Sequence, residues 1–367
     1  MKTGMMSERK NKLNCYPKIF IHPSSEKKIF EKILGTKNLK GINILLKPKN
    51  IVEKIFEKFF SSRYYKKKFK ALLQINEKVT ILSLEDNNIH LLKAQKFVEE
   101  AKIVLFQNGW RDNLYYKNLE KNKKNIFIEA FFAQGKQQKR KISKLAKHSF
   151  ALGNIKNNFC FKITNFKRNS ILFISQYFPC DHIALGKRKL SENDFFYNVD
   201  LFLLQLLSIF CRKHELSLHI LGRGIQNRNF EKDYFSRMNI NFNLISPKSN
   251  LDVYSKIEQY AMLVTVDSNL GYEAAAKGLK TCFFPLRSRM CNLPDRFFMF
   301  PLKMPESGFF WSCLPSQSEV YNILSNVFFS SKKIFQKEIL KVKFDDFMAY
   351  DKNNIKTKEM LWKIIQK

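Results

Sequence analysis

Short apolar runs alternate with amphipathic stretches along most of the chain, and this alternation limits the possible folds more than any other feature. A strand of a parallel sheet is covered on both faces, so it reads as a continuous apolar run, and each crossover to the next strand needs a helix. The pattern extends from the run Lys18–Ile21 to the run Thr281–Pro285. The sequence therefore predicts an α/β protein with doubly wound, parallel sheets.

The first half contains six candidate strands with amphipathic stretches between them. The strands are Lys18–Ile21, Ile42–Leu46, Val79–Leu82, Ile103–Phe106, Ile126–Ile128 and His148–Leu152, and the helices include Ile51–Phe60 and Ile89–Glu100. The second half repeats the strand and helix units. Its strands are residues 171–174, Leu216–Leu221, Phe242–Ile245, Leu263–Val266 and Thr281–Pro285, and its helices are Asp194–Lys213, Asn229–Met238, Leu251–Ala261 and Leu270–Lys277.

A polar, Asn-rich passage after Gly153 separates the two halves, and 367 residues suit two domains better than one. We expect an N-terminal Rossmann-like domain over residues 1–160 and a second over residues 168–330. A Lys-rich tail over residues 331–367 has helical spacing, and it could cross back to the first domain.

The charge is strongly positive, with 65 Lys plus Arg against 32 Asp plus Glu and a formal net charge of +33. Such an excess is typical of proteins that bind nucleic acid or anionic membranes. However, only 13 of the basic residues are Arg, and the abundance of Lys, Asn and Phe is what an A/T-rich genome produces. The charge alone therefore indicates no partner, whereas each Arg is informative because Lys is a poor substitute in bidentate phosphate recognition.

The seven cysteines show no CxxC or Cys/His spacing, so the sequence suggests neither a disulfide framework nor a zinc site. The longest apolar run, Leu201–Cys211, is about half the roughly 20 residues that a membrane-spanning helix needs. We expect a cytoplasmic protein, with peripheral contact to the inner face of the membrane as an option.

The segment Leu263–Phe284 has the pattern of a phosphate-binding site. An apolar strand ends at Asp267, Ser268 and Asn269 are good helix N-caps, and a helix then runs to Gly278. Helix N-termini at the carboxyl ends of parallel strands bind phosphates through free backbone N–H groups. Equally, the segment could be a capped helix between two buried strands, with Glu273 stabilising its first turn.

These residues resemble a known family. DSNLGYEAAAKG at residues 267–278 is similar to the donor-site loop of GT-B glycosyltransferases, in particular of O-antigen or capsule biosynthesis proteins. Further similar segments lie between residues 100 and 325. They are FQNGWRD from Phe106, LGNIKNNF from Leu152, ILFISQY from Ile171, ILGRG from Ile220 and ESGFFW from Glu306. The resemblance implies two Rossmann-like domains facing a cleft, and the same donor-loop pattern also occurs in nucleotide-sugar 2-epimerases.

The resemblance implies a donor site in the second domain. Its expected members are Arg223, Ser268, Asn269, Gly271, Tyr272, Glu273 and Arg287. Ser268, Asn269 and Gly271 match the phosphate-binding turn, and Glu273 matches the residue that binds the ribose. Arg223, in a Gly-Arg-Gly loop, and Arg287 would meet the phosphate, whose growing charge an Arg neutralises well.

The sequence contains no DxD carboxylate pair of the kind that holds Mg²⁺, so we expect no metal and no cofactor beyond the nucleotide-sugar substrate. An inverting enzyme needs a general base for the acceptor hydroxyl. The candidates are Asp112, Asp181 and His182, with His22 as a further one. Asp112 comes first because it follows the turn at Gly109, although an Asp beside Arg111 is more often an ion pair.

The stretch RYYKKKFK at Arg63–Lys70 mixes aromatic and basic side chains. It could dock on an anionic leaflet, which suits a lipid-linked acceptor, but a solvated helix face in a Lys-rich chain is the simpler interpretation.

The sequence thus predicts a metal-independent glycosyltransferase that moves a sugar from a nucleotide donor to a surface polysaccharide or lipid-linked glycan. The alternatives are a nucleotide-sugar 2-epimerase on the same scaffold and a basic RNA- or membrane-binding protein without enzymatic activity. The chain lacks nucleic-acid-binding motifs, so we expect no nucleic-acid partner.

Overall fold

A computed structural model describes residues 18–37, 39–43, 51, 53–54, 58, 63–67, 79–98, 101–161, 163, 166–185, 188–224, 228–249 and 251–366. The chain divides into two compact units. The first comprises Met1–Asn158 and Asp351–Lys367, and the second comprises Phe159–Tyr350. The segment predicted as one tail, residues 331–367, is therefore shared between the units, because α14 (Lys332–Lys341) belongs to the second and α15 (Ile355–Ile365) to the first.

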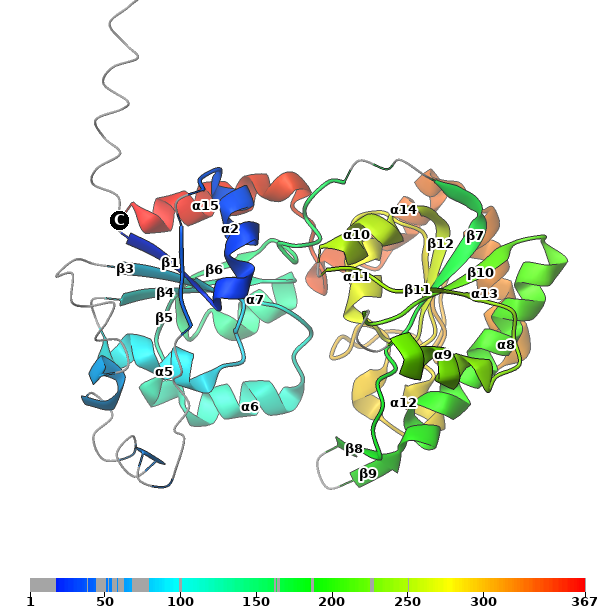
Figure 1. The fold of residues 1–367 in the computed structure, drawn as a ribbon, viewed down its shortest axis with the longest axis horizontal. Coiled ribbons are helices and arrows are strands. Elements are labelled where there is room, and N and C mark those ends of the chain that lie inside the picture. The colour runs from blue at the N-terminus through cyan, green and yellow to red at the C-terminus, as the bar shows by residue number, and fades with distance from the viewer. Residues whose placement is uncertain are drawn as a thin grey trace, which may run out of the picture. The chain divides into compact units, whose positions relative to one another are not determined.

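The first unit is built on a six-stranded parallel sheet in the order β2-β1-β3-β4-β5-β6 (Figure 1). The strands are β1 (Lys18–His22), β2 (Lys40–Gly41), β3 (Val79–Ser83), β4 (Ala101–Phe106), β5 (Ile128–Ala133) and β6 (Ala146–Ala151). The chain runs outward from β1 to β2 and then returns to β3 on the other side of β1. This reversal places the topological switch point between β1 and β3.

Helices connect these strands, as parallel pairing requires. They are α2 (Lys27–Leu34), α5 (Ile89–Phe97), α6 (Asn113–Lys121) and α7 (Lys136–Ile142). In α2, Ile29, Phe30, Ile33 and Leu34 are buried, which is the i, i+4 spacing of a helix with one face on the core. Helix α15, from the end of the chain, contacts α2 (Figure 1).

Two strand predictions in the first unit were wrong in their bounds. The strand predicted at Ile126–Ile128 begins only at Ile128 and continues to Ala133, because Ile126 is buried without joining the ladder. The strand predicted at Ile42–Leu46 is found at Lys40–Gly41, and residues 44–46 lie outside the described residues. Most of the predicted helix Ile51–Phe60 lies outside them as well.

The second unit has a five-stranded parallel sheet in the order β11-β10-β7-β12-β13. Its strands are β7 (Lys167–Ile174), β10 (Ser217–Leu221), β11 (Asn243–Ile245), β12 (Tyr260–Thr265) and β13 (Thr281–Phe283). The helices are α8 (Asn198–Lys213), α9 (Arg228–Ser236), α10 (Asp252–Ile257), α11 (Asn269–Ala276), α12 (Arg287–Met290) and α13 (Gln317–Phe329). The strand order reverses at β7, so the switch point lies between β7 and β12.

One helix of the described residues, Asn193–Lys213, is long and apolar enough to cross a membrane by length and composition alone. It consists of a π-helical turn and α8. Its apolar face is buried in the second unit, where Leu203, Leu207 and Phe210 are fully enclosed. This is the packing of a core helix.

Candidate functional site

Three loops meet at the carboxyl edge of the second sheet. They follow the neighbouring strands β10, β7 and β12 and contain, respectively, Arg223, Gln176 and Asp267. Two of them flank the switch point, where open α/β sheets bind ligands. All predicted donor-site residues except Arg287, which begins α12, lie on these loops or on the first turns of α11.

Ser268 is the N-cap residue of α11, with an extended backbone. Its carbonyl accepts hydrogen bonds from the N–H groups of Gly271 and Tyr272 (N···O 3.0 and 3.4 Å), but its side chain makes no capping bond. Its own N–H is bound instead by the Thr265 hydroxyl (3.2 Å). The Ser268 hydroxyl is therefore not needed to begin the helix, which leaves it available for a ligand.

Gly271 is required by packing. A Cβ atom at this position would lie 2.5 Å from Thr265 Cγ2 and 3.2 Å from Phe283 Cε1, both on strands beneath the helix. The resemblance implied that Gly271 serves the phosphate-binding turn. The structure gives a different reason, which is that α11 packs directly on β12 and β13.

Asn269 and Glu273 form a pair one turn apart on α11. The Asn269 side-chain amide donates a hydrogen bond to the Glu273 carboxylate, which is 2% exposed. Asn269 is only half-buried. The pair thus links the first residue of α11 to a buried carboxyl group one turn further along the helix.

Tyr272 points away from the ligand edge into an aromatic cluster. Its ring packs against Phe283 and Phe298, and its hydroxyl accepts a hydrogen bond from the Met299 N–H (3.1 Å). Burial raises the pKa of this phenol well above its ordinary value. The structure therefore places Tyr272 in the support of α11.

The Gly222–Gly224 loop is held by a buried carboxylate that the sequence did not suggest. Glu231 on α9 is fully buried and accepts a hydrogen bond from the Arg223 backbone N–H (2.6 Å). A side chain at Gly222 would collide with Glu231 Oε2, at 2.1 Å. Burial raises the pKa of Glu231, and the interactions with Arg223 oppose this shift. The only sequence signal was a Glu nine residues after Gly222, the first glycine of the loop.

The Arg223 side chain itself is exposed at this edge. Its guanidinium lies 5.2 Å from the ring centroid of Phe178, which follows β7 and is also exposed. Stacking on an aromatic ring orients a guanidinium without using its N–H donors. Arg223 is thus positioned by its neighbours and keeps its donors for an anion.

Arg287 differs from Arg223, because it is 1% exposed. Its guanidinium donates hydrogen bonds to Asp267 (2.5 Å), to Gln176 Oε1 (2.6 Å) and to the Phe195 carbonyl (2.8 Å), and it lies 3.6 Å from Asp200. The structure therefore shows Arg287 joining the loops after β7 and β12. Its donors are already used by the protein.

Asp200 is the second carboxylate around Arg287. It is buried, and it accepts a hydrogen bond from the Tyr234 hydroxyl (3.0 Å). Burial raises the pKa of Asp200 to about 6, although Arg287 and the Tyr234 hydrogen bond act in the opposite direction. The network beneath the carboxyl edge of the second sheet thus contains a carboxyl group whose pKa lies above its ordinary value.

The predicted general bases are placed differently. Asp112 is the N-cap of α6, where its carboxylate accepts a hydrogen bond from the Tyr115 N–H (2.8 Å). Its neighbour Arg111 pairs with the buried Asp86, through Nε at 2.8 Å from Oδ2 and a second, shorter contact. Asp181 and His182 are exposed at the start of the antiparallel hairpin β8 (His182–Leu185) and β9 (Arg188–Ser191).

His22 and Glu85 meet at the switch point of the first sheet. His22 ends β1 and is buried, with Nδ1 3.4 Å from the Ile42 carbonyl and Nε2 3.3 Å from Glu85 Oε2. Glu85 follows β3, its carboxylate accepts a hydrogen bond from the Asn88 amide (2.9 Å), and its side chain is 38% exposed. The sequence identified His22 but not Glu85, because only the strand order brings them together.

Among the residues that the structure describes, no group of three or more His, Cys, Asp or Glu side chains is arranged to hold a metal ion. One stretch of the first unit differs from the solvated helix face that the sequence favoured. Tyr64 and Tyr65 of the RYYKKKFK stretch are buried in the core rather than exposed, while Lys68–Lys70 lie outside the described residues.

A family model described as "putative O-antigen biosynthesis protein" matches residues 104–365. The chain belongs to this O-antigen biosynthesis protein family. Membership agrees with the resemblance of the donor loop, so that expectation is confirmed. A search of curated proteins found no match.

Solved structures share the fold. A glycosyltransferase from Rickettsia africae has a TM-score of 0.53 at 10% identity, with 96% of this chain and 99% of that chain covered. A protein from Listeria monocytogenes described as "putative UDP-N-acetylglucosamine 2-epimerase" has a TM-score of 0.54 at 11% identity, with 95% of each chain covered. The wall teichoic acid polymerase TagF, soaked with CDPG, has a TM-score of 0.50 at 10% identity, covering 95% of this chain and 88% of that one. The predicted fold class, α/β with two Rossmann-like domains of GT-B type, is confirmed.

Proposed function

We propose that this O-antigen biosynthesis protein is a glycosyltransferase that binds a nucleotide-activated sugar at the carboxyl edge of its second sheet. The proposal rests on two features at that edge. The first is the exposed Arg223, which Phe178 and Glu231 orient. The second is the N-terminus of α11, with Ser268 and Asn269. Both supply N–H donors to phosphate oxygens. The family match and the solved glycosyltransferase of the same fold support it.

The donor contacts follow from this geometry. Arg223 would neutralise the phosphate charge that grows as the sugar leaves. Ser268 and the first backbone N–H groups of α11 would hold a phosphate, and the Asn269–Glu273 pair would accept the ribose hydroxyls. Tyr272 and Arg287, both buried, would act by supporting α11 and the two loops rather than by touching the donor.

For the acceptor we propose Glu85 as the general base. Its carboxylate is partly exposed at the switch point of the first sheet and is positioned by Asn88 and His22. In the transfer step the acceptor hydroxyl oxygen bonds to the anomeric carbon, the bond from that carbon to the phosphate oxygen breaks, and the electron pair leaves on the phosphate. The acceptor proton goes to Glu85. Asp112 is less suited, because its carboxylate caps α6.

The acceptor class would be a surface polysaccharide or lipid-linked glycan, as expected for O-antigen or capsule synthesis, and no metal ion would take part. We place the protein in the cytoplasm, with membrane contact only at its periphery. The six cysteines that the structure describes are all free, which suits a reducing compartment.

Turnover assays distinguish this proposal from the epimerase alternative. That alternative is tested because the Listeria structure, which is described as an epimerase, has the same fold. UDP-, GDP- and CMP-sugars are incubated with the protein, with and without a lipid-linked glycan extract. A transferase releases nucleotide rapidly only with the acceptor, and Glu85→Gln slows this release at least about 100-fold. Conversion of the donor sugar without any acceptor would identify an epimerase instead.

A further inference from the structure

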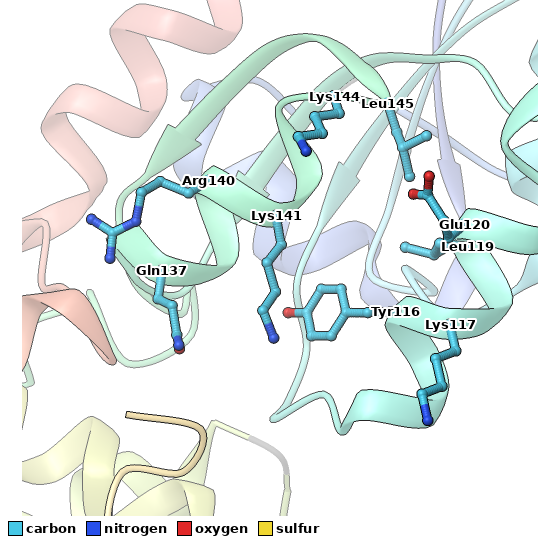
Figure 2. A pocket seen from close by; sticks show the side chains of 9 residues that line it. All are labelled: Tyr116, Lys117, Leu119, Glu120, Gln137, Arg140, Lys141, Lys144 and Leu145. Atoms are coloured by element: carbon cyan, nitrogen blue, oxygen red, sulfur yellow. The ribbon is translucent and has the colours of Figure 1, made fainter. Parts of the chain in front are cut away.

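A basic hollow lies between α6 and α7 of the first unit. Its volume is about 640 Å³. Nine residues line it: Tyr116, Lys117, Leu119 and Glu120 from α6, Gln137, Arg140 and Lys141 from α7, and Lys144 and Leu145 just after α7 (Figure 2). We call this site the α6–α7 hollow.

The hollow combines an apolar floor with a charged rim. Leu119 and Leu145 are buried, while Lys117, Arg140 and Lys144 are exposed. Lys141 and Tyr116 are half-buried between them and extend toward each other, with the ammonium 4.2 Å from the ring centroid (Figure 2). The ring holds this ammonium in place through a cation–π contact, so one cation is fixed inside the hollow.

The positive charge of the hollow is not balanced by its own acid. Glu120 is the one carboxylate in the lining, and it lies 3.6 Å from Lys123, outside the hollow. Within the described part of the chain, Lys117, Lys141 and Lys144 have no carboxylate within ion-pair distance. Burial lowers the pKa of Lys141, a shift that a bound anion would reverse.

The Lys-rich composition explains surface cations in general, but not this arrangement. A compositional bias places lysines on solvated faces, whereas Lys141 is held against Tyr116 above a leucine floor, beside one of the chain's 13 arginines. Three ammonium groups that line one hollow favour a phosphate dianion over a single negative charge. The volume exceeds that of a bare phosphate and lies in the range of small-molecule sites.

We propose that the α6–α7 hollow binds a phosphate monoester of a small sugar or polyol in solution. Lys141 would contact the phosphate, and the exposed Lys117 and Lys144, whose ammonium groups lie apart from it in Figure 2, would turn toward the phosphate from the rim. The Tyr116 hydroxyl and the Gln137 amide are placed to bind hydroxyl groups, and Leu119 and Leu145 to contact the carbon skeleton. The lining residues belong to the first unit and the predicted donor-site residues to the second, so occupancy of the hollow does not depend on the proposed transferase activity.

Titration calorimetry with glucose 6-phosphate tests the proposal. The wild type binds glucose 6-phosphate, and binds glucose at least tenfold more weakly. The double variant Lys141→Gln/Lys144→Gln weakens glucose 6-phosphate binding at least tenfold. Lys117→Gln, a rim change that cannot disturb the core, weakens it about threefold. Thermal unfolding of each variant confirms that it is folded, and nucleotide binding stays at the wild-type level.

The matched control is Lys333→Gln/Lys337→Gln, which removes the same charge from exposed positions of α14. It leaves glucose 6-phosphate binding within twofold of the wild type. If the control and test variants weakened glucose 6-phosphate binding equally, the effect would come from net charge alone, and the proposal would be overturned. The proposal would also be overturned if the wild type did not bind glucose 6-phosphate or bound glucose equally well. Binding only to vesicles of phosphatidylcholine with phosphatidylglycerol would overturn it too.

Discussion

At the scale of single residues, the two arginines predicted to meet phosphate differ in what surrounds them. Arg223 is exposed and stacked on Phe178, whereas Arg287 is enclosed by Asp267, Asp200, Gln176 and the rings of Phe195 and Phe196. A buried, fully hydrogen-bonded guanidinium holds a site together, and a solvent-facing one is free to bind a ligand. On this ground we propose Arg223, rather than Arg287, for the ligand contact.

The carboxyl group of Asp200 predicts a pH dependence of stability. In the folded chain its pKa is raised to about 6 from 3.8, so between these values the folded state binds a proton that the unfolded state does not. The contribution of Asp200 to stability therefore increases as pH falls from above 6 toward 4. Relative to Asp200→Asn, the wild type should gain about 1–3 kcal/mol of unfolding free energy between pH 7.5 and 4.5.

Urea denaturation of both proteins at the two pH values measures this gain. The Asp200→Asn variant provides the baseline for the wild type, because it retains every other titrating group. A difference in unfolding free energy between wild type and variant that stays constant with pH, or that shrinks at low pH, would contradict the assignment.

The sequence could identify Arg223, Ser268, Asn269 and Glu273 as site candidates because their signals are local: a glycine-flanked loop and a capped helix after an apolar run. The surroundings of Arg287 could not be predicted. Its partners are Gln176 and Asp200, 111 and 87 positions earlier in the chain, and only the strand order brings them together. Pairing of His22 with Glu85 has the same origin.

At the scale of elements, Glu231 connects α9 to the loop that carries Arg223. Glu231→Ala removes the acceptor of the Arg223 N–H and should weaken nucleotide binding about tenfold, since the loop loses its anchor. Glu231→Gln retains a carbonyl acceptor of the same size and should restore most of the affinity. Lys232→Ala, at an exposed position of the same helix, provides the control.

Calorimetry with the preferred nucleotide measures these affinities. Equal loss in the Ala and Gln variants would show that the negative charge of Glu231 matters rather than its acceptor. If Glu231→Ala bound the nucleotide with wild-type affinity, Glu231 would not position the Arg223 loop for binding.

The packing of α11 on its two strands predicts opposite behaviour at neighbouring positions. Gly271→Ala places a methyl group against Thr265 and Phe283 and should destabilise the protein by about 1–3 kcal/mol. Ser268→Ala removes a hydroxyl that makes no capping bond and should change stability by less than about 0.5 kcal/mol, while it weakens nucleotide binding.

Chemical denaturation and calorimetry on both variants test this pair. If Ser268→Ala destabilised the protein as much as Gly271→Ala, the hydroxyl would have a structural role. If it left nucleotide binding unchanged, Ser268 would have no place in the donor site.

The secondary structure shows where local signals are sufficient. Buried strands such as Val79–Ser83 are continuous apolar runs, so their positions were predicted to within a residue or two. The error at Ile126–Ile128 arose because Ile126 is as buried as a strand residue without being paired in the sheet. An apolar run in the sequence indicates that a segment is buried, but it does not show which residues pair with a neighbouring strand.

At the scale of the whole molecule, the end of the chain completes the first unit. Asp351 begins this last segment, and its carboxylate accepts hydrogen bonds from the N–H groups of Lys356 and Thr357 and from the Thr357 hydroxyl. The Asn158 and Asn354 side chains are hydrogen-bonded to each other at 3.0 Å. These polar contacts add to the apolar packing of α15, whose Leu361, Ile364 and Ile365 are buried.

Asp351→Ala should therefore destabilise the first unit by about 2–3 kcal/mol, because two buried donors lose their acceptor. Hydrogen exchange of α2 and α15 should increase, while that of the second unit stays unchanged. Asp233→Ala, at an exposed position of α9, should change stability by less than about 0.5 kcal/mol. Equal effects of the two substitutions would contradict this role of Asp351.

The central claim is that a nucleotide-sugar binds at the carboxyl edge of the second sheet, through Arg223 and the N-terminus of α11. Titration calorimetry with UDP, GDP and CMP, applied to the wild type, Arg223→Ala and Glu273→Ala, tests it most directly. The account predicts that one nucleotide binds the wild type and that each folded variant binds it at least tenfold more weakly. No binding of any of the three to the wild type, or unchanged binding to both variants, would contradict it.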